Sequence, residues 1–223
     1  MNTSPTHSTP DMPTLAAQGI TKTIGPKTLW SHLDLEVFPG EILCLMGPSG
    51  CGKSTLLNCL GQLDTCDSGK IFIQGERVEN CSARKRRLLR RTTIGYLFQD
   101  FALIENQTVR ENIALALPRR TKRSERTHLI QETLMQVGLE GFENTKIYAL
   151  SGGEQQRVAM ARLWARQPPV ILADEPTASL DRENATRILT LLRKCADTGA
   201  AVVLVSHDPW VADHADRKVQ LAS

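Results

Sequence analysis

The stretch GPSGCGKSTLLNCL, residues 47–60, decides the fold of this chain. Its spacing is Gly47, four residues, then Gly52, Lys53 and Ser54, which matches the pattern G-x-x-x-x-G-K-[S/T] of loops that hold phosphate groups. Glycines let backbone N–H groups approach an anion, and the apolar run that follows predicts a helix whose positive end points at the same place. The alternative, a plain glycine-rich turn before a helix, does not explain why every fixed position matches. Phosphate is therefore the first candidate ligand.

The same loop predicts how a nucleotide would be held. Lys53 would reach the β- and γ-phosphates, and the Ser54 hydroxyl would ligate Mg²⁺. A thiol within the loop, Cys51, leads us to expect that a thiol reagent blocks nucleotide binding and that ATP protects. The residues assigned to the nucleotide site are Gly47, Pro48, Ser49, Gly50, Cys51, Gly52, Lys53, Ser54 and Thr55.

Composition limits the class of protein. The 223 residues, 41% of them hydrophobic, can bury one substantial core, and we expect a single domain over residues 14–223 after a disordered lead, rich in Pro, Ser and Thr, over residues 1–13. A net charge of +3 is too small to suggest a dedicated nucleic-acid binder. Six cysteines without a Cys-x-x-Cys pair predict reduced thiols and a cytoplasmic protein. No apolar run approaches the ~20 residues that cross a bilayer.

Apolar runs alternate with helical patterns along the chain, which predicts an α/β fold with a largely parallel sheet. Strands of continuous apolar character are typical of a sheet covered on both faces. We expect such strands at residues 41–46, 170–174 and 201–206, and a helix at 54–63. A mostly helical lobe is expected at about 100–167, with helices at 108–117, 125–139 and 152–166.

Two acidic residues follow the apolar run VILAD, residues 170–174. Asp174, at the carboxyl end of a buried strand, lies where open α/β sheets bind ligands and would help to hold Mg²⁺. Glu175 would orient or deprotonate the water that attacks the γ-phosphate. An acidic turn before Pro176 would explain the pair on its own, but the phosphate loop favours the catalytic interpretation.

A second candidate anion site precedes the helix expected at 152–166. Ser151, Gly152 and Gly153 offer donors at a positive helix end, as in the phosphate loop. An ordinary serine N-cap, completed by Glu154 as a capping box, explains the same residues equally well. Local physics leaves both interpretations open.

The combination of motifs resembles the ATP-binding-cassette (ABC) ATPase family. The phosphate loop, LSGGEQQR at residues 150–157 and ILADEPTASLD at 171–181 occur in the family order, and the likeness extends over about residues 14–221. It implies a P-loop NTPase of the ABC ATPase type, with a mostly parallel core sheet, an antiparallel N-terminal sheet and an inserted helical lobe. It also implies hydrolysis of ATP with Mg²⁺.

The resemblance further implies a working assembly. Two copies, or two different cassettes, would close head to tail, so that Ser151, Gly152, Gly153 and Glu154 act on the ATP of the other subunit. A permease on a separate chain would sit in the membrane, with the ATPase attached to its inner face, and no nucleic acid is expected. In such an assembly the charged stretch at residues 83–91 would be a solvated helical face or a membrane-proximal contact.

Three further positions match the family residue by residue. Gln99 matches the glutamine that contacts Mg²⁺ and water and links the site to the transport subunit, although a lone glutamine after a strand is usually a surface residue. His207 matches the histidine near the γ-phosphate, and Asp181 matches the loop that crosses the dimer interface. Asp181, like Asp208 before Pro209, also reads as a helix N-cap. One departure is Ile24, which stands where the family usually places an aromatic residue that stacks on adenine.

Local sequence similarity narrows the resemblance to one group within the family. Residues 94–117, 146–163 and 168–181 resemble the ATPase subunits of small exporters of the macrolide and lipoprotein-release type, and more closely those of lactococcin-type bacteriocin export. This implies export of a peptide, bacteriocin or lipophilic substrate. A soluble ABC-type machine of repair or translation, or a P-loop kinase, would be the alternatives. The first usually carries a long coiled-coil insertion or two cassettes, which this sequence lacks, and the second has no use for the LSGGE helix.

Overall fold

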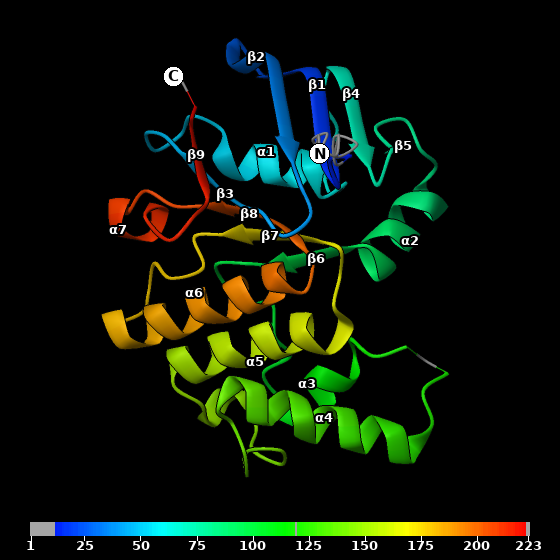
Figure 1. Ribbon diagram of the computed structural model, residues 1–223, viewed down its shortest axis with the longest axis vertical. Helices are drawn as coiled ribbons and strands as arrows, with labels where there is room; N and C mark the ends of the chain where they lie inside the picture. The colour runs from blue at the N-terminus through cyan, green and yellow to red at the C-terminus, as the bar shows by residue number, and fades with distance from the viewer. Residues whose placement is uncertain (1–11, 119, 222–223) are drawn as a thin grey trace, which may run out of the picture.

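A five-stranded parallel sheet forms the centre of the computed structural model, which describes residues 12–118 and 120–221 (Figure 1). Its strand order is β6-β7-β8-β3-β9, and every neighbouring pair is parallel. The strands are β3 (Ile42–Met46), β6 (Ile94–Leu97), β7 (Val170–Asp174), β8 (Ala201–Val205) and β9 (Arg217–Gln220). The apolar runs expected at 41–46, 170–174 and 201–206 are three of them, and they are buried because helices cover both faces.

A second, antiparallel sheet lies above the first in Figure 1. Its order is β2-β1-β4-β5, formed by β1 (Leu15–Ile24), β2 (Lys27–Val37), β4 (Ser68–Ile73) and β5 (Glu76–Arg77). The helix α1 (Lys53–Leu60) lies between the two sheets, where Leu56 and Leu57 join a core with residues of both. The phosphate loop is thus anchored to two sheets at once.

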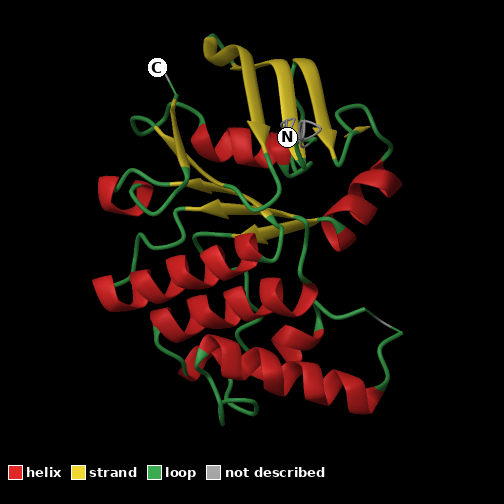
Figure 2. Ribbon diagram, viewed as in Figure 1, coloured by secondary structure: helices red, strands yellow, loops and turns green. Residues whose placement is uncertain are grey.

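The other face of the parallel sheet carries the helical lobe (Figure 2). The helices α5 (Gly152–Arg166) and α6 (Arg182–Asp197) lie next to the sheet. The helices α3 (Val109–Ala114) and α4 (Arg123–Val137) lie on the far side of these two, away from the sheet. Apolar residues of α4, α5, α6 and the sheet form one continuous core. The bounds predicted for α5 are confirmed. The helix expected at 108–117 is shorter, because its last turn unwinds after Ala114.

Three further helical elements complete the described chain: α2 (Ala83–Thr92), the 3₁₀ turn Ile147–Ala149 and α7 (Pro209–Ala212). None of the helices within residues 12–118 and 120–221 has both the length and the apolar character needed to cross a bilayer. Apart from Met12 and Pro13, the lead predicted for residues 1–13 lies outside the described residues.

Candidate functional site

The phosphate loop connects β3 to α1 and depends on glycine at both ends. Gly47 has φ 151°, and a Cβ there would meet Cys51 Sγ at 2.8 Å and the Leu221 carbonyl oxygen at 2.9 Å. Gly52 has φ 94°, and its Cβ would meet Leu29 at 3.0 Å. Both positions therefore require glycine, for conformation and for space.

Lys53, the first residue of α1, folds over this loop. Its ammonium Nζ donates to the carbonyl oxygens of Gly47 at 2.7 Å and Pro48 at 2.9 Å. The positive charge lies at the helix N-terminus, where the macrodipole also favours an anion. The loop therefore presents the electrostatics that a phosphate chain needs.

Ser54 and Asp174 come together although they are far apart in sequence. Ser54 Oγ donates to Asp174 Oδ1 at 3.1 Å. Burial raises the pKa of Asp174, the hydrogen bond from Ser54 lowers it, and the nearby charge of Glu175 raises it further. A hydroxyl and a carboxylate are hard oxygen ligands of the kind that Mg²⁺ prefers. Gln99 lines a pocket together with Ser54. Among the described residues, no group of three or more His, Cys, Asp or Glu side chains is placed to hold a metal ion.

Glu175 is held in an uncommon backbone conformation next to His207. Its φ is 45°, a left-handed value that a non-glycine residue adopts rarely and that recurs at functional sites. Its backbone N–H donates to the Val205 carbonyl at 3.1 Å, so the turn is tied to β8. The Glu175 carboxylate, with 16% of the side chain exposed, lies 2.8 Å from Nδ1 of His207, whose side chain is 72% exposed. The two side chains form one hydrogen-bonded pair.

This pair predicts a pH dependence. The hydrogen bond to Glu175 and its negative charge raise the pKa of His207 above the ordinary 6.5. The pair is therefore fully stabilising below pH 6.5 and is weakened as the pH rises through the higher value of the folded protein. We expect an NMR titration of the His207 imidazole to show a midpoint above 6.5 that falls in Glu175→Gln. A midpoint that the substitution leaves in place would contradict the pairing.

One pocket of about 480 Å³ brings these predicted residues together. It opens beside the phosphate loop, and Ile24 and Leu29 form its apolar wall. The sequence-predicted site residues that line it are Ser49, Gly50, Gly52, Lys53, Ser54, Thr55, Gln99, Glu175 and His207.

The residues assigned to the second anion site lie outside this pocket. Ser151 caps α5, accepting a hydrogen bond from the Glu154 N–H at 3.3 Å, and the Glu154 carboxylate accepts from the Ser151 N–H at 2.8 Å. That N–H bond lowers the pKa of Glu154. Asp181 likewise caps α6, accepting from the Asn184 N–H at 2.8 Å. Within one chain, both therefore act as helix caps.

One expectation about the loop's surroundings, that for Cys51, changes. Cys51 is only 2% exposed and its thiol lies in the core, so the prediction that a thiol reagent attacks it is wrong for this conformation. Trp30 is also buried: its indole N–H donates to the Gly52 carbonyl at 3.4 Å beneath the loop. Trp30 therefore supports the loop, while Ile24 occupies the exposed wall of the pocket.

Two polar residues that the sequence did not single out connect α5 to this region. The Gln156 side chain, which is buried, donates to the Pro176 carbonyl at 2.6 Å, directly after Glu175. Asn184 accepts from Arg157 at 2.8 Å and packs against Gly153. The one sequence signal for Gln156 is that it lies on the apolar face of the predicted helix. The Gln156 contact joins α5 to the turn after β7, and the Asn184 contacts join α5 to α6.

Comparison with known proteins gives consistent similarities. Residues 30–178 match the family described as ABC transporter. The chain is 38% identical to an uncharacterized ABC transporter ATP-binding protein, MJ1508, of Methanocaldococcus jannaschii, covering 92% of this chain and 90% of that protein. It is 39% identical to the lipoprotein-releasing system ATP-binding protein LolD of Francisella tularensis, over 85% and 83%.

A solved structure is similar over nearly the same length. The dimeric structure of a post-hydrolysis state of the ATP-binding cassette MJ0796, bound to ADP and Pi, superposes with a TM-score of 0.84 at 36% identity. The superposition covers 93% of this chain and 94% of the other. The likeness therefore includes both sheets and the helical lobe.

Proposed function

This chain belongs to the ABC transporter family as one of its ATPase cassettes, and we propose that it hydrolyses ATP to drive export through a separate membrane permease. The observation that carries the proposal is the convergence of residues from three parts of the sequence. Lys53 and Ser54 of α1, Asp174 at the end of β7 with Glu175 next to it, and His207 after β8 meet beside the phosphate loop. This arrangement provides for binding and for hydrolysis in one place.

The loop and Lys53 bind the phosphates in this proposal. The backbone N–H groups and the ammonium stabilise the charge of the transferring phosphoryl group, which is the main requirement of this reaction. Ser54, Gln99 and Asp174 would hold Mg²⁺, which would supply positive charge to stabilise the phosphates. The hydrogen bond between Ser54 and Asp174 prepares two of these oxygens for that role.

Glu175 activates the water in this proposal. Its carboxylate is positioned by the left-handed turn and accepts a hydrogen bond from His207 when Nδ1 carries the proton. Glu175 orients the attacking water and takes its proton, while His207 fixes the carboxylate and faces the γ-phosphate. Ser151, Gly152, Gly153 and Glu154 of a second copy complete the site, and Asp181 lies at the contact between copies.

The transport role rests on the relatives. Besides LolD, the chain is 38% identical over 87% of its length to the macrolide export ATP-binding/permease protein MacB of Vibrio parahaemolyticus, of which it covers 30%. We propose that residues 14–223 form one ATPase domain, with its helical lobe at about 100–167, at the inner face of the membrane. The cargo we propose is a peptide, a bacteriocin or a lipophilic molecule, selected by the permease.

The experiment is to trap tagged Glu175→Gln with Mg-ATP in native membranes and identify what is recovered with it. Nucleotide-dependent recovery of a multi-span membrane protein is expected, and Lys53→Ala, which should bind ATP about 10- to 150-fold more weakly, is the control. Recovery of soluble partners alone, such as ribosomes or DNA, would contradict the permease and favour a soluble ABC machine.

A further inference from the structure

The helix α2 carries a dense positive charge that the proposed catalytic site does not use. Six of its ten residues are Lys or Arg, and none is acidic. Basic side chains in the first turn lie at the positive end of the helix dipole, which disfavours them, and like charges three or four positions apart repel one another. The charge therefore weakens the helix, and an anion bound outside it would relieve the repulsion.

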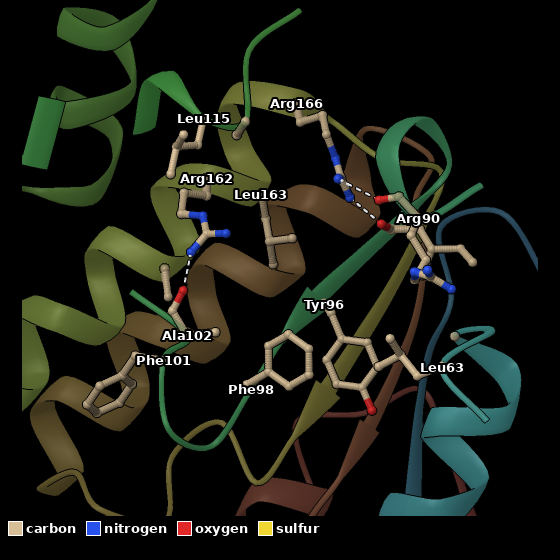
Figure 3. A pocket seen from close by; sticks show the side chains of 14 residues that line it. Leu63, Arg90, Tyr96, Phe98, Phe101, Ala102, Leu115, Arg162, Leu163 and Arg166 are labelled. Atoms are coloured by element: carbon tan, nitrogen blue, oxygen red, sulfur yellow. Dashed lines mark hydrogen bonds between the residues drawn. The ribbon is translucent and has the colours of Figure 1, made fainter. Parts of the chain in front are cut away.

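Contacts with the rest of the chain hold α2 in one orientation. Leu89 is buried in the core that the two sheets share. Arg90 donates to the Gln62 carbonyl and lines a pocket of about 220 Å³ between β6 and α5 (Figure 3). Arg166 of α5 donates in turn to the Arg90 carbonyl at 3.0 Å. These contacts determine which face of α2 is turned outward.

The outward face combines three arginines with a leucine. Four exposed residues follow the spacing i, i+3, i+4, i+7, which places them on one face of a helix. They are Arg84, Arg87, Leu88 and Arg91. Leu88 lies among the three arginines and is 53% exposed. We call these four residues the basic face of α2.

No carboxylate of the described chain pairs with the basic face. Among residues 12–118 and 120–221, none of the ion pairs involves Arg84, Arg87 or Arg91. Lys85, on the side of the same helix, does pair with an acidic residue, Glu76. Three positive charges on one exposed surface are therefore left without a counter-ion from the described chain.

The make-up of the basic face favours a lipid surface over other polyanions. Each arginine near an anionic lipid surface strengthens binding by about fivefold. An apolar side chain among the charges can enter the boundary between headgroups and acyl chains, as in helices that lie on a membrane. A nucleic acid would use the charge, but its single strands are bound by stacking on aromatic side chains, and α2 has none.

We propose that the basic face of α2 lies against anionic phospholipid headgroups, with Leu88 inserted among them. The position of the chain at the inner face of a membrane rests on the proposed function, and a direct contact with lipid is added to it. Arg84, Arg87 and Arg91 bind the headgroup phosphates, while the opposite face of α2 stays packed on the chain. The helix thus gives the ATPase an attachment to the membrane besides the permease.

The test is co-sedimentation of the purified chain with lipid vesicles. The chain should bind vesicles of equal parts phosphatidylcholine and phosphatidylglycerol, and bind pure phosphatidylcholine far more weakly. The triple variant Arg84→Gln, Arg87→Gln and Arg91→Gln should lose about 100-fold in affinity for the anionic vesicles, about fivefold for each charge. Added salt should weaken binding of the unmodified chain far more than that of the variant, because it screens charges at a surface.

A matched control removes the same net charge elsewhere. The triple variant Arg123→Gln, Arg187→Gln and Lys194→Gln changes exposed residues of α4 and α6, so it should keep its vesicle affinity within a few fold. Leu88→Ser should weaken binding by about fourfold at low and at high salt, as the loss of about one buried methylene predicts. Thermal unfolding followed by circular dichroism reports that each variant is folded.

Four outcomes would overturn the proposal. These are equal binding to neutral and anionic vesicles, no binding to either, full binding by the α2 variant, and an equal loss in the matched control. Labelled duplex and single-stranded DNA form the last arm. Binding of DNA that depends on the three arginines, without binding of vesicles, would assign the face to nucleic acid instead.

The vesicle assay requires no ATP hydrolysis. ATP turnover is measured separately on the same preparation. Failure of the proposed ATPase activity would therefore be seen apart from failure of the lipid contact.

Discussion

Glu175→Gln is expected to lower ATP turnover by about 10²–10⁴-fold, the usual contribution of a general base. Glutamine has nearly the same size and can keep the left-handed turn, but its amide oxygen is a far weaker base than a carboxylate. The phosphate loop, Lys53 and Ser54 are untouched, so the affinity for ATP should stay within a few fold. Phosphate release and equilibrium nucleotide binding, measured on the same preparation, check both parts.

The matched control for this substitution is Glu183→Gln. Glu183 lies in the first turn of α6, is exposed and pairs with Arg187, away from the nucleotide pocket. It should retain turnover close to that of the unmodified chain. Unchanged phosphate release in Glu175→Gln would remove Glu175 from the role proposed here.

Lys53→Ala should weaken ATP binding itself, by about 10- to 150-fold, since a hydrogen bond to a charged group is worth about 1.5–3 kcal/mol. The substitution removes the ammonium at the start of α1 and frees the carbonyls of Gly47 and Pro48. Those carbonyls would then face the phosphates without a compensating charge. Calorimetric titration with ATP at fixed Mg²⁺ measures the loss of affinity.

A second lysine tests whether the charge at this particular place matters. Lys27 also donates to a loop carbonyl, that of Gly50 at 3.1 Å, but from the start of β2. Lys27→Ala should leave the affinity within a few fold. An affinity that Lys53→Ala does not change would refute the assignment of the phosphate loop.

Much of the fold follows from local patterns. The apolar runs at 170–174 and 201–206 predict buried strands because each residue of such a run needs cover on both faces of the sheet. The α5 range is predicted because Ser151 and Glu154 mark its start and Pro168 lies just beyond its end. The antiparallel sheet was expected only through the family resemblance. The pairings of β1 with β2 and with β4 are interrupted by bulges, so the sequence signal of these strands is weak.

The candidate site likewise has one part that the local sequence predicts and another that depends on tertiary packing. Spacing alone identifies the phosphate loop, because glycine positions and a lysine at a helix start are fixed by geometry within six residues. The pairing of Glu175 with His207 joins residues 32 apart, and that of Ser54 with Asp174 joins residues 120 apart. No local pattern could specify those distances. The burial of Cys51 was missed for a related reason, since neighbouring residues suggested an open loop while the packing of Leu29 and Trp30 closed it.

By itself, the sequence determined the glycine-rich loop before α1, the three core strands, the extent of α5 and the presence of two carboxylates at the end of a buried strand. Only the tertiary structure decided the strand order, which places α1 beside β7, and which face of α2, with three of its arginines, is left exposed. The physical reason is the sequence distance over which each interaction acts. Backbone conformation and apolar periodicity are set by residues a few positions apart, whereas the approach of charged groups depends on how whole elements pack.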